Sequence, residues 1–264
     1  MTMRIISVLL VIVTVLSVLT SCSKSFDERL DKADKLLDGK PYVIEVELDF
    51  RCDDAEMSGM FDELEKNYTT VYVKDGKMKI VNKLDINDGE KVNSFYTVYT
   101  LIDGVVYYDL KYSVDGIVSK ENKYYSAITD GQRRTLVDSM CLFGGVSLDG
   151  FTAMNEKRDG DEHSAVYTGP SSENTIVIEK MLASLLEGAC SNVSLIDSSL
   201  CVELEDKRYD TVVLNCQYTV VISGKTYPVG LTAELEFDYD EIFSVTLPDN
   251  TDSYTATDIE NIIG

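Results

Sequence analysis

Few residues of the 264-residue chain have the types and spacing that catalysis requires. His163 is the single histidine, and it lies in the polar run 157–163, which is typical of a hairpin tip and not of a base held beside a nucleophile. The nucleophile motif G-x-S-x-G is incomplete around Ser147, because Asp149 occupies the position of the second glycine. Neither of the two glycine-rich phosphate-binding motifs occurs. The sequence therefore predicts no catalytic residue and a protein that is not an enzyme.

The acidic residues and cysteines show no metal-binding pattern either. Residues 85–89 match a calcium loop at three positions, but the acidic residue expected in fifth place is missing. None of the five cysteines beyond residue 22 has the C-x-x-C spacing of a redox or zinc site; they are Cys52, Cys141, Cys190, Cys201 and Cys216. We expect no metal and no cofactor. Free thiols are the simplest interpretation of an odd number, while one or two disulfides among the five stay open.

The overall charge narrows the classes of partner. The chain has 24 Lys and Arg against 46 Asp and Glu, a formal charge of −22, and 44% hydrophobic residues. We expect no nucleic-acid partner, because so many carboxylates repel a phosphate backbone. The apolar fraction is well above that of a disordered acidic chain and suffices for a buried core.

The N-terminus has the features of an export signal. Arg4 precedes an apolar run, residues 5–19, that as a helix would reach about 22 Å, short of the roughly 30 Å hydrocarbon core of a bilayer. The run ends in Leu-Thr-Ser-Cys, with the cysteine at position 22. This resembles the bacterial lipobox, in which an apolar and two small residues precede the cysteine that receives diacylglycerol. The resemblance implies a signal peptide over residues 1–21 and lipidation of Cys22. The alternative is an ordinary secretory signal followed by an incidental cysteine.

Lipidation at Cys22 implies a location and a partner. Residues 22–264 would form one extracytoplasmic domain of 243 residues with a formal charge of −23. A diacylglyceryl group supplies two acyl chains, which suffice for stable anchoring. We therefore expect the domain to be held at a bacterial membrane, either the cell membrane or, where the organism has one, the outer membrane.

Hydrophobic periodicity predicts the helices and strands of this domain. Residues 26–37 have a helical period and precede Gly39. Residues 42–50 and 231–239 alternate apolar with mostly acidic residues, which is typical of strands with one face in water. We expect the two runs to belong to one sheet.

Two-residue turns connect many of the remaining strands. Each turn pairs Asp or Ser with Gly, which supplies the positive φ of a tight hairpin; the turns are at 75–76, 103–104, 115–116 and 223–224. Successive strands should therefore be neighbours. The runs 95–102 and 105–112 carry bulky apolar residues on both faces, so we expect something to cover their second face.

Three more segments have a helical period. Those beginning near Asp130 and Ser172 are strongly apolar, and we expect them to cover the runs 95–102 and 105–112. The third, residues 55–66, is interpreted as an ordinary surface helix, with a movable flap as the alternative.

This order of elements predicts an α+β fold, in which a few amphipathic helices cover a large, curved antiparallel sheet. In element order and alternation it resembles the half-barrel lipoproteins of bacteria, of the LolA and mycobacterial LppX kind. That resemblance implies a curved sheet that wraps helices and encloses an apolar cavity for acyl chains.

The leading hypothesis for function is a non-enzymatic lipoprotein that holds an apolar or lipid-like ligand. The ligand would lie between the sheet and the helices at 132–143 and 176–186. The residues expected to line this space are Tyr99, Leu101, Tyr107, Leu136, Met140, Met181 and Leu185. One alternative is a structural or interaction module of the cell envelope with a packed core, whose protein partner the sequence does not identify. The other is an enzyme of unrecognised class.

Overall fold

The computed structural model describes residues 24–37, 40–65, 67–87, 91–129, 131–132, 146–159, 162–186, 192–205, 208–259 and 262. The expected signal peptide and its Cys22 lie outside the described residues, as do Leu136, Met140, Cys141 and Cys190.

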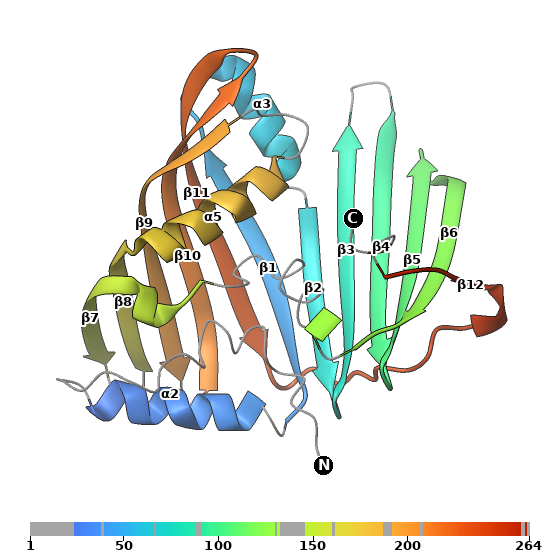
Figure 1. Cartoon of the computed structure of the whole chain (residues 1–264), viewed down its shortest axis with the longest axis horizontal. Coiled ribbons are helices and arrows are strands. Elements are labelled where there is room, and N and C mark those ends of the chain that lie inside the picture. The colour runs from blue at the N-terminus through green and yellow to red at the C-terminus, as the bar shows by residue number, and fades with distance from the viewer. Residues whose placement is uncertain are drawn as a thin grey trace.

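Strands dominate the described part of the chain (Figure 1). Its α-helices are α2 (Lys24–Leu37), α3 (Ala55–Leu64) and α5 (Ser172–Leu185), and its 3₁₀ turns are Leu148–Gly150 and Thr251–Ser253. The strands are β1 (Tyr42–Arg51), β2 (Asn67–Lys74), β3 (Lys77–Asn87), β4 (Val92–Ile102), β5 (Val105–Val114), β6 (Ile117–Ala127), β7 (Phe151–Asp159), β8 (Glu162–Pro170), β9 (Asn192–Glu205), β10 (Arg208–Ile222), β11 (Lys225–Asp238) and β12 (Thr255–Ala256).

All twelve strands form one open sheet in the order β12-β6-β5-β4-β3-β2-β1-β11-β10-β9-β8-β7. Every pairing is antiparallel except that of β12 with β6. The expected fold, a large curved antiparallel sheet with a few amphipathic helices, is confirmed, with strands predominating. The alternating runs 42–50 and 231–239 are direct neighbours, because β1 pairs with β11.

The expected turns set the register next to each turn, and a β-bulge then shifts the register between β5 and β6 at Tyr112 and Ser113. Asp75, Asp103, Asp115 and Ser223, together with the glycine that follows each, have positive φ. These left-handed conformations match the twist of adjacent strands, so two residues suffice to reverse the chain. The hairpins β2–β3, β4–β5, β5–β6 and β10–β11 follow from local sequence alone.

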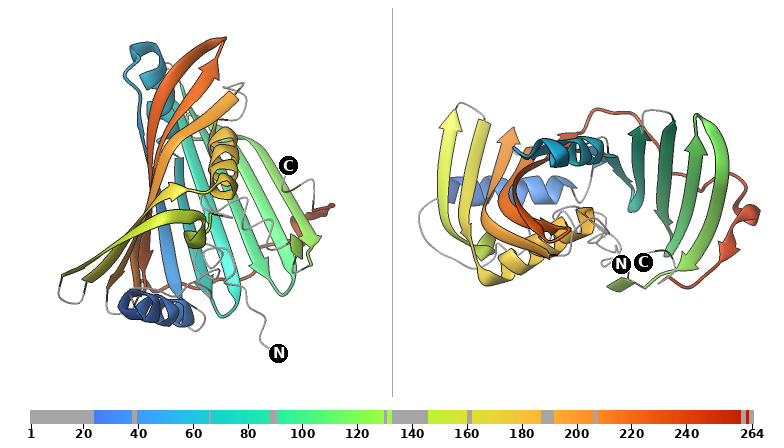
Figure 2. Two further views of the ribbon diagram at one scale, coloured as in Figure 1. Left: turned by 60° about the vertical axis from the view of Figure 1, so that its left-hand side comes forward. Right: turned by 90° about the horizontal axis from the view of Figure 1, so that it is seen from above.

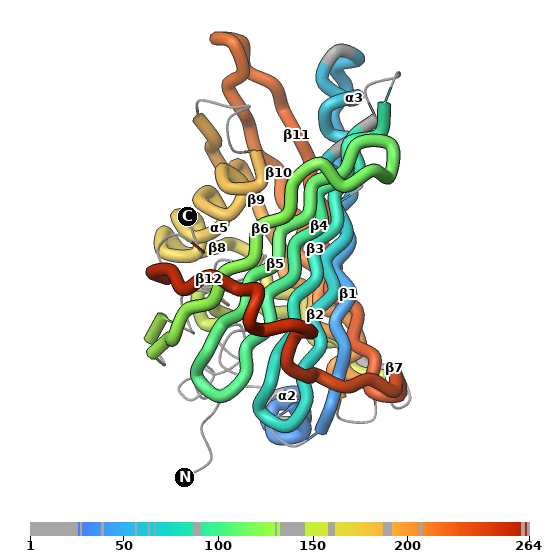
Figure 3. Tube along the Cα trace, turned by 90° about the vertical axis from the view of Figure 1, so that its right-hand side faces the viewer, coloured from blue at the N-terminus to red at the C-terminus, as the bar shows by residue number. Residues whose placement is uncertain are grey.

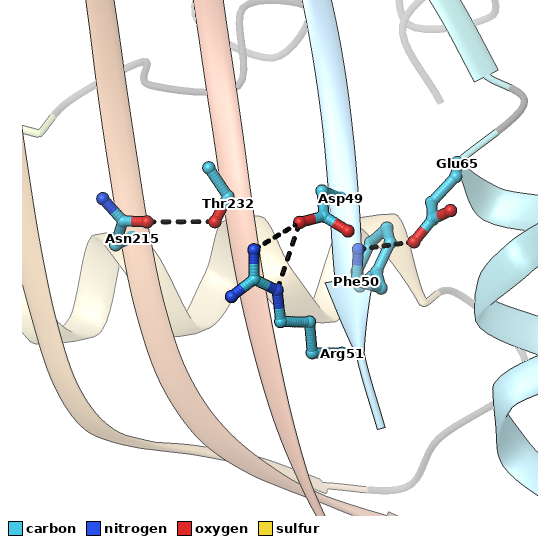
Figure 4. A network of polar contacts seen from close by, with 6 residues as sticks. All are labelled: Asp49, Phe50, Arg51, Glu65, Asn215 and Thr232. Carbon is cyan, nitrogen blue, oxygen red and sulfur yellow. Dashed lines mark hydrogen bonds and ion pairs between the residues drawn. The ribbon is translucent and has the colours of Figure 1, made fainter. Parts of the chain in front are cut away.

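The sheet divides into two groups of strands at the junction of β1 and β2. These two strands pair only from Tyr42 to Val46 of β1; beyond Val46, β1 continues to Arg51 beside β11, and α3 follows before β2 begins. Beyond the junction, the backbone N–H of Phe50 donates to Oε1 of Glu65 at 2.6 Å, which replaces the missing strand partner (Figure 4). We call β1 and β7–β11 the acidic wing, and β2–β6 with β12 the tyrosine wing. The two wings diverge on either side of α3 (Figure 2).

The inner face of the sheet, defined here as the face that carries the core, is covered by helices on the acidic wing. Phe26, Leu30 and Leu37 of α2 and Ile178 and Leu182 of α5 are buried in the core. Helix α5 packs mainly on β9 and β8, and α2 on β10. The prediction that the helix at 172 covers β4 and β5 is therefore wrong: α5 follows β8 directly and returns into β9, so it folds back on those strands.

The outer face of the tyrosine wing is covered by the C-terminal segment, residues 239–258, which crosses the strands (Figure 3). Its Phe243 packs on Tyr72, with ring centroids 5.4 Å apart, and Tyr254 packs on Tyr107 at 5.6 Å. Lys74 Nζ donates to the carbonyl of Phe243 at 3.0 Å. Extended chain thus lies over part of the outer face of β5, in a place where a helix was expected.

Helix α3 is packed against strands β1 and β3. Met57 and Phe61 are buried, and the ring of Phe61 stacks on that of Phe50 at 5.3 Å. Lys225 Nζ lies 3.1 Å from the Asp54 carboxylate, just before the helix. This supports the interpretation of residues 55–66 as an ordinary surface helix.

Candidate functional site

The inner face of the tyrosine wing is arranged in rows of facing residues. Registers between β3, β4, β5 and β6 align one residue of each strand per row. Row 1 is Met78, Leu101, Val106 and Ser126; row 2 is Ile80, Tyr99, Tyr108 and Tyr124; row 3 is Asn82, Thr97, Leu110 and Asn122; row 4 is Leu84, Phe95, Tyr112 and Lys120; row 5 is Ile86, Asn93, Val114 and Ile117.

Burial is highest in row 1, lower in row 2 and lowest in rows 3 to 5. Row 1 is buried throughout. In row 2, Ile80 is buried, but the three tyrosines are half-buried. In rows 3 to 5 no side chain is buried, and Phe95 is 39% exposed. We call rows 3 to 5 the open inner face.

Aromatic rings line the inner face of the tyrosine wing in pairs across the strands, in rows 2 and 4. The rings of Phe95 and Tyr112 are 4.9 Å apart, as are those of Tyr99 and Tyr108, and Tyr124 stacks on Tyr108 at 6.3 Å. The Tyr112 hydroxyl donates to Oδ1 of Asn93 at 2.8 Å. These pairs hold large side chains in place although water reaches them.

The same face is almost free of charge. None of the positions of β2 to β6 that face inward carries a carboxylate, and Lys120, in row 4, is their single cation. Burial raises the pKa of Tyr99, with a further contribution from Tyr108, and burial also raises that of Tyr108. Both hydroxyls therefore stay neutral at physiological pH. The arrangement suits contact with apolar groups.

The residues expected to line a ligand site are only partly brought together. Tyr99 and Leu101 lie on the inner face, in rows 2 and 1. Tyr107 faces outward beneath Tyr254, so it does not share a face with Tyr99. Met181 and Leu185 of α5 are half-buried against the core of the acidic wing, where Ile178 and Leu182 fill the space between helix and sheet. Leu136 and Met140 lie outside the described residues.

Sequence reasoning missed Phe95, Leu110 and Tyr112 of the open inner face. The signal was present in the turn at 103–104: a two-residue loop pairs Ile102 with Val105, so Tyr99 faces Tyr108. Counting outward from the turn places Leu110 and Tyr112 on the face of Tyr99 and places Tyr107 on the other.

His163 lies near a hairpin end as expected, but it is buried. Its side chain is on the inner face of β8, only 1% of the residue is exposed, and Nδ1 is 3.8 Å from Oε1 of Glu156. The neighbouring Ser164 points to the opposite face of the strand, because successive residues alternate. The structure therefore does not place His163 as a base for Ser164.

A polar pocket of about 290 Å³ lies near this hairpin end, chiefly on the outer face of the acidic wing. Glu162, Glu203, Glu205 and Asp210 line it, together with Lys157 and Ser164. Within the described residues, no group of three or more His, Cys, Asp or Glu side chains has a geometry that would hold a metal ion.

Cys52, Cys201 and Cys216 are free thiols. Burial raises the pKa of Cys201 to about 11 and that of Cys216 to about 12, with additional contributions from Glu203 and Asp197 respectively. Because the thiolate is the reactive form, neither of these two thiols is activated as a nucleophile.

The C-terminal segment joins both faces of the tyrosine wing. Tyr254 lies on the outer face, β12 pairs with Tyr124 and Tyr125 at the edge of β6, and Ile259 and Ile262 belong to the core cluster on the inner face. Beyond the C-terminal segment, the chain thus passes the edge of the sheet at β6, and Ile259 and Ile262 add to the core.

No helix among the described residues combines the length and the apolarity that crossing a membrane would require.

Comparisons with known proteins give distant structural likenesses. No protein-family model matches the sequence, and no curated protein matches it significantly. The chain is similar to a beta-barrel-like protein of the domain of unknown function DUF1849 from Brucella abortus, with 10% identity over 77% of this chain and 99% of that chain and a TM-score of 0.27. A protein from Nitrosomonas europaea described as AttH shares 11% identity over 81% of this chain and 54% of that chain, with a TM-score of 0.15. At these TM-scores, neither likeness carries an argument about the fold or the function of this chain.

Proposed function

We propose that this protein is a non-enzymatic lipoprotein that binds an apolar or lipid-like ligand on the open inner face of the tyrosine wing. The observation that carries the proposal is a surface on which Phe95, Leu110 and Tyr112 are held in ordered rows but remain accessible to water. An ordinary core would bury such side chains fully, as row 1 does.

Burial of the ligand alone would supply the binding energy. Each methylene that leaves water contributes about 0.8 kcal/mol, so a long acyl chain needs no charged recognition group. The lack of carboxylates on this face supports an apolar ligand, because an acyl chain placed against charged side chains would desolvate them at a cost.

Native mass spectrometry of the full chain, purified in a mild detergent, tests the proposal. Wild-type protein is expected to retain a lipid-sized ligand in addition to any covalent anchor. The double variant Phe95→Asn with Leu110→Asn is expected to lose at least tenfold of that occupancy, because two apolar contacts disappear. The matched control is Tyr68→Asn with Ile196→Asn, which changes two exposed residues away from the open inner face. Absence of a ligand from wild type, or equal losses in both double variants, would contradict the proposal.

We further propose that Cys22 carries the diacylglyceryl anchor and that the protein resides outside the cytoplasm at a bacterial membrane. The support is the lipobox-like sequence that ends at position 22. The Cys22→Ala variant is expected to leave the membrane fraction or to accumulate unprocessed. Unchanged processing and equally firm membrane association would show that this cysteine is not the anchor.

A second candidate function is that of an interaction module of the cell envelope. It is favoured by the outer face of the acidic wing, where Glu45 stands opposite Glu236 and Glu47 opposite Glu234. Like charges that face each other destabilise a sheet, so a cationic protein or polymer would gain by covering them. Capture of such a partner should weaken steeply as the salt concentration rises.

A further inference from the structure

Exposed apolar residues gather at one end of the tyrosine wing, where β4 begins and the β5–β6 hairpin turns. Ile117 is 74% exposed, Val118 57% and Val92 39%. Backbone hydrogen bonding brings the three together: Asp115 N–H donates to the carbonyl of Val92 at 2.8 Å, and Ile117 pairs with Val114 across the turn. We call Val92, Val114, Ile117 and Val118 the apolar tip.

The apolar tip is apolar on both faces of the sheet. Ile117 and Val114 belong to row 5 on the inner face, whereas Val118 pairs with Ser113 on the outer face. Val92 precedes Asn93 of row 5, so it also faces outward. The tip is therefore a wedge with two apolar sides.

The backbone and charges of the wedge are compatible with a lipid surface. The one carboxylate of the turn, Asp115, accepts a hydrogen bond from the Val92 N–H through Oδ1 at 2.9 Å. One backbone N–H and one carboxylate oxygen of the tip are therefore already paired with each other. Lys91 and Lys120 flank the tip and are exposed. Lysines in this position place their ammonium groups among lipid phosphates while their stems follow the apolar surface.

The tip also continues into the proposed ligand site without a break. Row 5 adjoins row 4, with Phe95 and Tyr112, and row 3, with Leu110. An acyl chain could therefore pass from a membrane that touches the tip to the open inner face. Lys120 is the one charged side chain among the inward positions of β2 to β6 along this path.

We propose that the apolar tip docks on a lipid bilayer at the depth of the headgroups. A flat protein surface would cover only one of the two apolar sides of the tip, whereas lipids would contact both. The flanking lysines are complementary to anionic headgroups. The contact would bring acyl ligands to the open inner face, and this account of their uptake rests on the proposed function. Asp115 limits the depth, since its carboxylate stays at the water boundary.

A single-tryptophan reporter tests this contact. The natural sequence has no Trp, so Val118→Trp in the full chain gives one fluorophore at the tip. The protein is reconstituted on vesicles of phosphatidylcholine and phosphatidylglycerol. Lipids with brominated acyl chains, which quench tryptophan fluorescence, are included either in these vesicles or in a second vesicle population. We expect a blue-shifted emission and at least twofold quenching, in whichever population the tip touches.

Ile242→Trp is the matched control, because position 242 is 98% exposed on the C-terminal segment and shares the same anchor. Equal quenching of the two reporters, or none at Val118→Trp, overturns the proposal. A blue shift that needs no lipid and grows with protein concentration overturns it too, because a second protein copy would then cover the tip.

A second substitution, Ile117→Asp, added to the Val118→Trp reporter, should abolish most of the quenching without changing the melting temperature, since the side chain is exposed. Retained quenching in this variant overturns the proposal. The two proposals can fail separately. If wild-type protein carries no ligand but the Val118→Trp reporter is quenched, the proposed function is contradicted. If wild-type protein carries a ligand but the reporter is not quenched, the docking of the tip is contradicted.

Discussion

The two wings share one sheet and one alternating pattern, yet they differ in charge and in cover. Residues 67–127, which contain β2 to β6, have eight lysines and eight acidic residues, so the whole formal charge of −22 arises elsewhere in the chain. The same stretch holds nine of the 16 tyrosines. Helices α2 and α5 cover the inner face of the acidic wing, whereas the C-terminal segment covers the outer face of the tyrosine wing.

The difference teaches that alternation alone does not tell which face of a strand is closed. In the acidic wing, rows of carboxylates lie on the outer face, which is in water, and the inner face is buried. The tyrosine wing carries extended chain across part of its outer face and leaves part of its inner face accessible. A neutral, accessible inner face is the feature that sets the tyrosine wing apart as the candidate binding surface.

The largest expected contrast comes from truncating one leucine in each wing. Leu214→Ala removes a fully buried side chain of β10 and should lower the free energy of unfolding by about 2–5 kcal/mol. Leu110→Ala, in row 3 of β5, should cost about 1 kcal/mol or less, because that side chain is only half-buried. Urea unfolding measures both. Equal losses would mean that the inner face of the tyrosine wing is as closed as that of the acidic wing.

Removal of the aromatic contact of the C-terminal segment should act on the tyrosine wing alone. Tyr254→Ala deletes a buried ring that packs on Tyr107 and should destabilise the protein by about 3 kcal/mol. Hydrogen exchange is expected to rise in β5 and β6 and to stay unchanged in β9 and β10. Faster exchange throughout the sheet would show that the wings unfold as one unit.

The junction between the wings depends on Glu65. Glu65→Ala leaves the N–H of Phe50 without its carboxylate acceptor and should cost about 1–2 kcal/mol. Glu65→Gln keeps an acceptor and should cost less. Exchange of the Phe50 amide, followed by mass spectrometry or NMR, should accelerate in the alanine variant; unchanged protection would show that the amide has another partner.

The smallest effect is expected from relieving charge on the acidic wing. Burial raises the pKa of Glu234, and the nearby Glu47 and Glu236 raise it further. A carboxyl whose pKa is higher in the folded than in the unfolded state destabilises the fold when ionised, so stability should rise as the pH falls toward that raised pKa. Glu234→Gln should stabilise the protein at pH 7 by about 0.5 kcal/mol and flatten this rise. High salt should shrink the difference, and a loss of stability would contradict the assignment.

Much of the fold follows from local patterns. The hairpin turns with positive φ, the apolar stripe of α2 and the alternation in β1 and β11 each depend on residues close in sequence. The cover of each face depends on distant segments. Nothing near β5 indicates that Tyr254, 147 positions after Tyr107, will pack on it, and the period of α5 does not specify which strands it covers.

The candidate site divides in the same way. The sequence by itself determined the two-residue turns and the registers next to them, between β2 and β3 and between β4 and β5, because steric limits on φ and ψ act within a few residues. The turns do not set the register of β3 with β4, nor that of β5 with β6 beyond the bulge at Tyr112 and Ser113. The sequence also determined that the inward positions of these strands lack carboxylates. Only the tertiary structure decided which rows are closed, because burial depends on chain segments that meet after folding: the apolar residues of rows 1 and 2 lie in the core or pack against it, whereas rows 3 to 5 remain partly exposed.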